Sequence, residues 1–335
     1  MLNEQQFIHV FYPFLKKYKD WIYDIYFTCR VPPFTQDAMG SVITEEYRDA
    51  VFQNAMYIQD SLGIKVSATF NNFNVSPKYE NYKMFVDNLK PLYEQGLRSM
   101  TIPHGHWVAM GLKKEFPEMM IKNTILRKVA TAQDFWYSAE QGFDYINVDR
   151  ILMRDVEELK NIRRAQLMFQ QKHGRYIEIA LLTNEGCLGR CPVMDEHYSY
   201  NNLRKDNELP YFHHEISKVT CEHKWENEIG AFFFKTATIP PFKKEFEEYL
   251  NHVDVFKMHG RDSIDRLNET MEIVESFAEG KEILSHTSQT YLDGIPSDEL
   301  RGWRNKIKKC RFQCWDCNYC DIVSEHKKKS LNGPN

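Results

Sequence analysis

The chain contains no long hydrophobic run: none of its 335 residues belongs to a stretch approaching the roughly 18 apolar residues that cross a bilayer. The amino terminus also lacks the apolar region of a signal peptide, because acidic residues, Pro13 and the Lys16-Lys17 pair interrupt it. No Gly-x-Gly-x-x-Gly segment follows the first predicted strand, which argues against a dinucleotide-binding Rossmann fold. These absences predict a cytoplasmic protein without a membrane span.

Neither sign of charge is in large excess. The chain has 43 basic and 47 acidic residues and a net charge of −4, so it has no general attraction to nucleic acid. The aromatic content is high at 14%, and a chain of this length can bury a sizeable core. This composition excludes a chain that is disordered throughout.

Eight short β-rich runs alternate with amphipathic helical segments, most of which begin at a capping residue and end at glycine. The predicted strands are residues 23–28, 64–70, 98–103, 120–126, 143–148, 176–182, 231–237 and 253–258. The predicted helices are residues 44–62, 76–95, 131–141, 155–173, 241–251 and 263–278. The alternation predicts parallel pairing and a (β/α)8 TIM-type barrel, with a doubly wound open sheet as the alternative.

Two regions depart from this alternation. Residues 195–228 form a long polar excursion, rich in His and Tyr, after the sixth predicted strand. Residues 281–335 leave the alternating pattern and contain a run of cysteines. We therefore predict a barrel over residues 1–280 and a separate C-terminal extension over residues 281–335.

The eight cysteines are clustered, and seven of them follow residue 186. In a reducing compartment stable disulfides are rare, so the clustering favours metal binding. The cysteines are Cys29, Cys187, Cys191, Cys221, Cys310, Cys314, Cys317 and Cys320.

Four of these cysteines lie within eleven residues, from Cys310 to Cys320. Four thiolates at this spacing can hold tetrahedral zinc or an iron–sulfur cluster. A cluster is favoured, because structural zinc sites use two cysteine pairs separated by a longer span. Trp315 and Tyr319 lie between the ligands, where they would shield sulfur from water or pack the tail against the barrel.

The other four cysteines form a second candidate set. Cys187 and Cys191 follow the sixth predicted strand, and Gly186 and Gly189 allow the tight backbone that aims two thiolates at one ion. Cys221 lies in the following excursion. Cys29 ends the first predicted strand, and in a barrel it would lie at the same edge, where active sites occur. A buried core thiol is the alternative for Cys29.

Other polar residues follow the predicted strands and would meet at that edge as a pocket. Asn71, Asn72, Arg150, Asn184 and Glu185 belong to this group. The basic members suit a carboxylate or phosphate group. The candidate catalytic residues are His104, His106, Asp149, Lys257, His259 and Arg261.

Two segments carry a resemblance to a known family. Gly189-Arg190-Cys191 and the Lys-x-x-Gly-Arg pattern of Lys257, Gly260 and Arg261 resemble motifs of the collagenase-like peptidase family. That family includes anaerobic ubiquinone hydroxylases and prephenate-dependent RNA hydroxylases. The resemblance covers roughly residues 20–280. Only Cys187 and Cys191 match by motif, and Cys221 follows by order; the family's Asn-Arg-Gly-x-Cys stretch is absent here.

The resemblance implies a TIM-type barrel with an oxygen-sensitive [4Fe–4S] cluster, working without oxygen. It implies a hydroxylase or oxidoreductase acting on an aromatic, quinone-like or RNA substrate, with an electron donor as partner. With the C-terminal run, the chain would hold one or two clusters, or zinc in the run.

Two other functions stay open from the sequence. Cys310-x3-Cys314-x2-Cys317 has the spacing of radical S-adenosylmethionine enzymes, although there the motif follows the first strand. A non-catalytic iron–sulfur carrier or zinc-stabilised binding module is the third reading.

Overall fold

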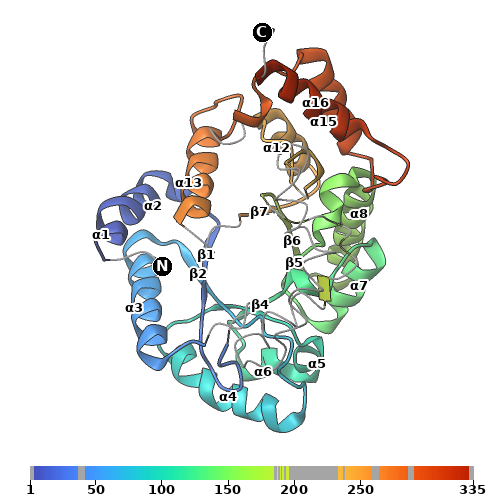
Figure 1. The fold of residues 1–335 in the computed structure, drawn as a ribbon. Helices are drawn as coiled ribbons and strands as arrows, with labels where there is room; N and C mark the ends of the chain where they lie inside the picture. The colour runs from blue at the N-terminus through green and yellow to red at the C-terminus, as the bar shows by residue number, and fades with distance from the viewer. Residues whose placement is uncertain are drawn as a thin grey trace, which may run out of the picture.

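The protein is described by a computed structural model that covers residues 4–36, 42–184, 187, 189, 191, 194–195, 233–236, 238–258, 264–285 and 290–331. Within these residues, one sheet of seven parallel strands runs in chain order from β1 to β7. Figure 1 shows the sheet curled in the middle of the molecule, with helices around its outside. The strands are β1 Asp24–Thr28, β2 Lys65–Thr69, β3 Ser99–Ile102, β4 Met120–Asn123, β5 Tyr145–Asn147, β6 Glu178–Leu182 and β7 Val255–Lys257.

Helices connect the strands, and three of them begin at the predicted capping residues Thr44, Thr131 and Asp155. The Thr44 side chain caps α3, and Thr131 forms a capping box with Asp134 at the start of α7. The longer helices are α2 Tyr12–Tyr18, α3 Glu45–Leu62, α4 Tyr79–Glu94, α7 Ala132–Gln141, α8 Val156–His173, α12 Lys243–Leu250, α13 Ile264–Ala278, α15 Ser297–Ile307 and α16 Tyr319–Leu331. The shorter ones are α1 Glu4–Gln6, α5 Gly105–Trp107, α6 Lys113–Glu115, the π-helical η1 Phe7–Phe11 and η3 Val108–Leu112, and the 3₁₀-helical η2 Lys19–Trp21, η4 Ile125–Arg127 and η5 Arg150–Arg154.

Seven of the predicted runs contain the observed strands, but the strand predicted at residues 231–237 is wrong where the structure describes it. Residues 233–235 are helical. The Phe234 side chain is fully buried against Trp303, with the ring centroids 5.2 Å apart, and the Phe234 carbonyl accepts a hydrogen bond from Arg154. A short apolar run has no periodicity that separates a strand from a buried helical turn. Here tertiary packing favours the turn.

The two edge strands of the sheet face each other across a seam. No ladder joins β1 to β7 among the described residues. The Tyr26 hydroxyl of β1 bridges the seam by donating to the Met258 carbonyl at 2.7 Å. The fold is therefore α/β, with a curled parallel sheet resembling a half-barrel.

The main apolar core lies between the outer face of the sheet and the helices. Strand residues such as Val66, Met100 and Ile121 are buried there against Phe85 and Leu89 of α4. Burial of this apolar area is the main contribution to the stability of the body. No helix among the described residues combines the length and apolar character needed to cross a membrane.

A second apolar cluster joins the C-terminal helices to the body. It contains Phe234, Phe242, Leu292, Trp303 and Ile307. Backbone and ionic contacts reinforce it. The Val156 amide donates to the Lys308 carbonyl at 3.0 Å, and Arg304 binds both carboxylate oxygens of Glu245. The last described residues are thus packed on the body through α8 and α12.

Candidate functional site

The concave face of the sheet is polar. In a parallel sheet the residues paired across neighbouring strands point to the same face. Tyr26, Ser67, Thr101 and Lys122 therefore share one face with their register partners, while the apolar residues that alternate with them face the helices. The inward residues are Asp24, Tyr26, Thr28, Lys65, Ser67, Thr69, Ser99, Thr101, Met120, Lys122, Tyr145, Asn147, Glu178, Ala180, Leu182, Val255 and Lys257. This face can therefore bind polar groups, unlike the branched apolar layers that usually fill a barrel.

One ion pair and one tyrosine–carboxylate hydrogen bond occupy the amino-terminal end of this face. Lys122, whose side chain is only 4% exposed, forms an ion pair with Asp24 and lies 4.4 Å from the Tyr145 ring centroid. The Tyr23 hydroxyl donates to Glu178. Burial raises the pKa of Glu178 and of Tyr145. The buried Lys122 ammonium thus has its counter-ion within the protein.

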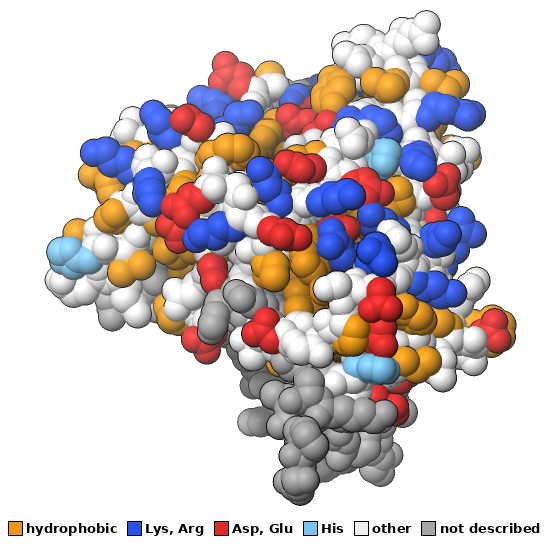
Figure 2. Space-filling view, turned by 90° about the horizontal axis from the view of Figure 1, so that it is seen from above, with side chains coloured by type: hydrophobic (Ala, Val, Ile, Leu, Met, Phe, Trp, Pro, Cys, Tyr) orange, Lys and Arg blue, Asp and Glu red, His pale blue; other side chains and the backbone are white. Residues whose placement is uncertain are grey.

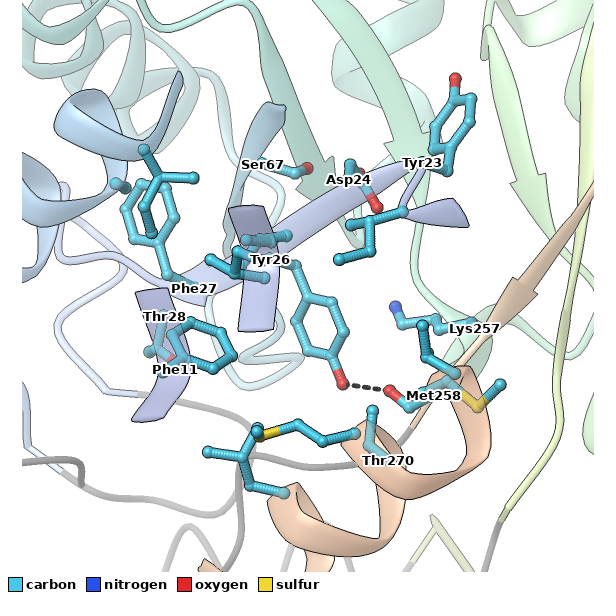
Figure 3. A pocket seen from close by; sticks show the side chains of 18 of the residues that line it. Phe11, Tyr23, Asp24, Tyr26, Phe27, Thr28, Ser67, Lys257, Met258 and Thr270 are labelled. Carbon is cyan, nitrogen blue, oxygen red and sulfur yellow. Dashed lines mark hydrogen bonds between the residues drawn. The ribbon is translucent and has the colours of Figure 1, made fainter. Parts of the chain in front are cut away.

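At the carboxyl end of the seam, Lys257 and Tyr26 lie side by side. The Lys257 Nζ atom is 4.7 Å from the Tyr26 ring centroid. Figure 3 shows the Lys257 amine pointing toward the Tyr26 ring, beside the hydrogen bond from Tyr26 to Met258. A positive charge is therefore presented where the strands end, which is where substrates bind in parallel α/β proteins.

These residues line a cavity of about 1670 Å³ between β1, β7 and the helices α2, α3 and α13. One side contains Ser67, Thr101, Asn147 and the Lys122–Asp24 pair, and the other is apolar. The Asn147 Oδ1 atom is buried and has no hydrogen-bond partner among the described residues. The volume exceeds the roughly 300–1,000 Å³ typical of small-molecule sites, so an organic ligand fits.

The predicted catalytic residues are dispersed. His104 is only 9% exposed and packs against Trp107, with ring centroids 4.6 Å apart and the ring planes inclined by 60°. Burial lowers its pKa to about 4, so the imidazole is neutral, and its Nε2 atom has no partner among the described residues. His106 is exposed on α5. The Asp149 carboxylate caps η5 by accepting from the Ile151 amide at 2.9 Å.

Of the remaining candidates, Lys257 alone lines the cavity. His259 and Arg261 lie outside the described residues, and so does Glu185. Asn72 binds Gln36 and the Asn74 amide, and Arg150 is buried. The catalytic assignment of these residues stays a prediction.

Cys29 lies on the helix-covered side of the sheet. It follows the inward-facing Thr28, is 1% exposed and belongs to the apolar core. Burial raises the pKa of the Cys29 thiol to about 12. A metal ligand must be deprotonated, so Cys29 would have to lose a proton in an apolar environment. This environment is that of a core thiol.

The loop after β6 contacts the C-terminal cysteine run. A Cβ atom on Gly189 would lie 2.3 Å from Cζ of Phe312, so the backbone of the loop lies directly against that ring. Gly189 stands between Cys187 and Cys191, and Phe312 stands between Cys310 and Cys314. The fold therefore brings together two cysteine segments that are far apart in the sequence. Cys221 lies outside the described residues.

The thiols of the run influence one another. Burial raises the pKa of Cys314, and the neighbouring Cys310 raises it further. Burial also raises the pKa of Cys320, whose thiol donates to the Phe234 carbonyl at 3.2 Å. Among the described residues no three His, Cys, Asp or Glu side chains are already placed around one metal position. The donors nevertheless fit a soft metal centre, since all of them are thiols on one short segment.

Trp315 does not shield sulfur as one reading of the sequence suggests, because its side chain is 85% exposed. Tyr319 packs on α15, where a Cβ atom at Gly302 would collide with its hydroxyl. Tyr319 therefore helps to hold the tail in place.

The surface shows no large region of one charge on the side that Figure 2 presents. Basic and acidic side chains are interspersed over this face, which is seen from above the view of Figure 1. This arrangement agrees with the near balance of charge in the sequence. It offers no continuous basic surface of the kind that binds a nucleic acid backbone.

Comparisons with known proteins give little further information. No family model matches the sequence, and no curated protein matches it. Among solved structures, the U32 peptidase Mk0906 matches with a TM-score of 0.41 and 16% sequence identity, over 56% of this chain and 79% of that one. This is a distant resemblance to a collagenase-like peptidase. It assigns no function to any residue of this chain.

Sequence reasoning missed the inner face and Arg154, which lies beside the cysteine run. The signal for the inner face was present, because the strand segments DIYFT, KVSAT and SMTI alternate polar and apolar residues with period two. Arg154 had no such signal. Its partners are backbone carbonyl groups about 80 residues away in the chain. Every residue has a backbone carbonyl, so the sequence does not indicate which ones Arg154 binds.

Proposed function

We propose that this chain is an iron–sulfur enzyme with a TIM-type barrel body, which modifies an organic substrate without using oxygen. The cysteine segments at the carboxyl edge hold the metal, and the substrate occupies the cavity between β1 and β7. The reaction class is hydroxylation or a related oxidoreduction of an aromatic or quinone-like molecule, with RNA as the other substrate class.

The observation that carries this proposal is the contact between Gly189 and Phe312. It places the loop containing Cys187 and Cys191 against the run from Cys310 to Cys320. Two cysteine segments lie in contact here, and a soft metal held by thiolates in a reducing compartment would account for their placement. Thiolates are the ligands that iron–sulfur clusters use, so the placement of the two segments supports a cluster.

Each part of the site has a separate role in the proposal. Cys187 and Cys191, with Cys221 as a further ligand, hold a cluster near the strand ends. A bound cluster would supply one-electron transfer, and hydroxylation, which removes two electrons from the substrate, would also need an oxygen-atom donor that is itself reduced, or water with an electron acceptor. Lys257 holds an anionic group of the substrate, and the hydroxyls of Ser67 and Thr101 bind its polar atoms.

The barrel in this proposal differs from the eight-stranded form. The seam between β1 and β7 is occupied by the cavity, with the Tyr26–Met258 hydrogen bond across it. Substrate bound there would contact both edge strands. Binding would thus complete the barrel on the side where the sheet has no ladder among the described residues.

Iron and sulfide analysis of protein purified without oxygen tests the proposal. We expect iron and acid-labile sulfide with absorbance near about 400 nm, and loss of iron in a Cys187→Ser/Cys191→Ser double variant. Cys29→Ala is the matched control, because Cys29 is a thiol in the apolar core, and its iron content should equal that of the wild type. Unchanged iron in the double variant would refute the assignment of this loop.

The same preparation separates the competing readings. A colourless protein with zinc bound and no iron would contradict the iron–sulfur enzyme and support the zinc-stabilised module. A brown protein whose cluster no small molecule or RNA perturbs would support a carrier instead. Reductive cleavage of added S-adenosylmethionine, lost on replacing Cys310, Cys314 and Cys317, would support the radical enzyme.

A further inference from the structure

Arg154 is a buried cation at the junction of three chain segments. It ends η5 after strand β5, and it is only 1% exposed. Its Nη2 atom donates to the carbonyls of Phe234 and Thr236 at 2.9 and 2.6 Å. Its own carbonyl accepts from the Arg311 amide at 3.1 Å, and the Phe312 ring centroid lies 5.2 Å from its guanidinium carbon. The body, the segment at residues 233–236 and the tail therefore meet at this side chain.

The positive charge of Arg154 has no carboxylate partner among the described residues. Its Nε atom is buried and has no hydrogen-bond partner among the residues that the structure describes. Burying an uncompensated charge is costly, and carbonyl dipoles offset only part of that cost. The guanidinium thus requires an anion close by.

Thiols, which can become anionic, lie beside Arg154. Its Nη1 atom is 3.9 Å from Sγ of Cys310. Cys320 bonds to the same Phe234 carbonyl that Arg154 binds. Two of the four cysteines of the run, Cys310 and Cys320, are thereby connected to this cation or to the carbonyl that it binds.

The backbone after Cys310 is strained in a way that fits a ligand loop. Arg311 and Phe312 have φ angles of 50° and 56°, in the left-handed region that residues other than glycine rarely adopt. Such conformations persist where neighbouring contacts enforce them, and they concentrate at ligand-binding loops. Here the Arg311 ion pair with Asp155 at 2.7 Å and the packing of Phe312 on Gly189 enforce them.

We infer that Cys310, Cys314, Cys317 and Cys320 bind their own metal centre, and that Arg154 is the buried counter-cation of that centre. Four thiolates outweigh the positive charge of a zinc ion or a cluster core, so the centre carries the net negative charge that the guanidinium requires. Metal binding then locks the tail onto the body over the loop of Cys187 and Cys191. This inference deepens the proposed function, because it adds a second centre beside the one at the barrel edge.

Arg154 acts through the thiolates, so it is a positioning residue and its test needs a readout that folding alone does not change. The full-length protein is loaded with iron and sulfide, or with zinc, and Arg154→Met and Arg154→Lys variants are compared. We expect roughly 10–100-fold weaker retention of the tail metal against a chelator in Arg154→Met. With iron, its reduction potential should fall, because reduction adds negative charge near a site that has lost a cation. Arg154→Lys should keep most of the potential.

Arg304→Met is the matched control. Arg304 also joins the tail to the body, but its guanidinium is paired with Glu245, as the distances of 2.8 and 2.5 Å show. This variant should loosen α15 without moving the potential or the metal retention. If Arg154→Met does not fold, Arg154→Lys and Arg154→Gln carry the comparison of charge retained against charge lost.

Three results would overturn the inference. The first is an unchanged metal retention and potential in Arg154→Met. The second is an equal change of metal retention and potential in Arg154→Met, Arg154→Lys and Arg304→Met, which would show that Arg154 has a structural role only. The third is a chain ending at Lys309 that folds and keeps its full metal content. The truncation would then refute the tail centre alone. The proposed function would still be supported if the Cys187→Ser/Cys191→Ser variant loses iron, so failure of the inference and failure of the proposed function can be told apart.

Discussion

Two regions of the molecule bury a cation, and they balance its charge in different ways. On the inner face of the sheet, Lys122 has Asp24 as its ion partner and the Tyr145 ring beside it. At the junction with the tail, the partners of Arg154 among the described residues are carbonyl groups, the Cys310 thiol and the Phe312 ring, with no carboxylate. In the first region, the Asp24 carboxylate neutralises the Lys122 ammonium as soon as the chain folds. In the proposed tail centre, the thiolates that hold the metal would supply the negative charge that Arg154 lacks. The two regions thus contrast a cation neutralised by a carboxylate of the chain with a cation that metal binding would neutralise.

The largest expected effect comes from breaking the complete pair. Asp24→Asn leaves the Lys122 ammonium buried without a counter-ion, and we expect a loss of about 3–5 kcal/mol in the free energy of unfolding. Urea denaturation measures it. The Asp24→Leu/Lys122→Met double variant removes both charges and should regain most of the loss. A loss under about 1 kcal/mol in the single variant would mean that the pair behaves as an exposed one.

His104 is a further buried titratable group, and it needs no counter-ion because it remains neutral. Burial lowers its pKa from 6.5 to about 4, so the unfolded chain binds a proton that the folded chain excludes. Stability should therefore be complete above pH 6.5 and should fall as the pH drops toward 4, by an amount on the order of 3 kcal/mol. Unfolding curves across this range measure the loss.

A variant of His104 itself is the control for this effect. His104→Gln should flatten the pH dependence of stability over this window, because it removes the buried imidazole. An equal slope in the wild type and in His104→Gln would show that another group is responsible.

A smaller effect is expected at the contact between the two cysteine segments. Gly189→Ala places a methyl group 2.3 Å from the Phe312 ring, and overpacking of this kind costs about 1–3 kcal/mol. The thermal midpoint should fall, and protease should cut the tail faster. Combining it with Phe312→Ala should restore the midpoint toward that of Phe312→Ala alone. Equal proteolysis of wild type and Gly189→Ala would argue against the contact.

The smallest effect is expected at Lys257. This lysine shares the inner face with Lys122 but is only half-buried, and one of its contacts is with the Tyr26 ring. Loss of this cation–π contact in Lys257→Met should contribute no more than about 1 kcal/mol. Lys122→Met should lower the free energy of unfolding by more, because it leaves the Asp24 carboxylate without its ion partner. Thermal denaturation of both variants gives the comparison, and equal losses would remove the distinction between the two lysines.

The sequence predicted much of the sheet and little of the site. Seven strands lie within predicted runs because alternation and the glycines that end helices mark them, as Gly63 and Gly142 do. The run at residues 231–237 failed because the burial of Phe234 depends on Trp303, far along the chain. His104 follows strand β3, and its burial by Phe34 and Trp107 results from packing that no local pattern shows.

The cysteine segments illustrate the same limit. Spacing predicted that Cys310 to Cys320 can serve one centre, and it predicted a second set including Cys187 and Cys191. Whether the two sets meet depends on how the tail returns to the body. Gly189 and Phe312 decide this by direct contact, and neither residue stands out in the sequence except as a neighbour of cysteine.

The contact between Gly189 and Phe312 also orders events in time. The two residues are separated by about 120 positions, so at about 5–20 residues per second the ribosome delivers the second some 6 to 25 seconds after the first. During that interval the loop of Cys187 and Cys191 is already synthesised but lacks the ring that will cover it. An assembly factor delivering metal to this loop would therefore have open access to it before the tail emerges, and would have to displace the tail afterwards.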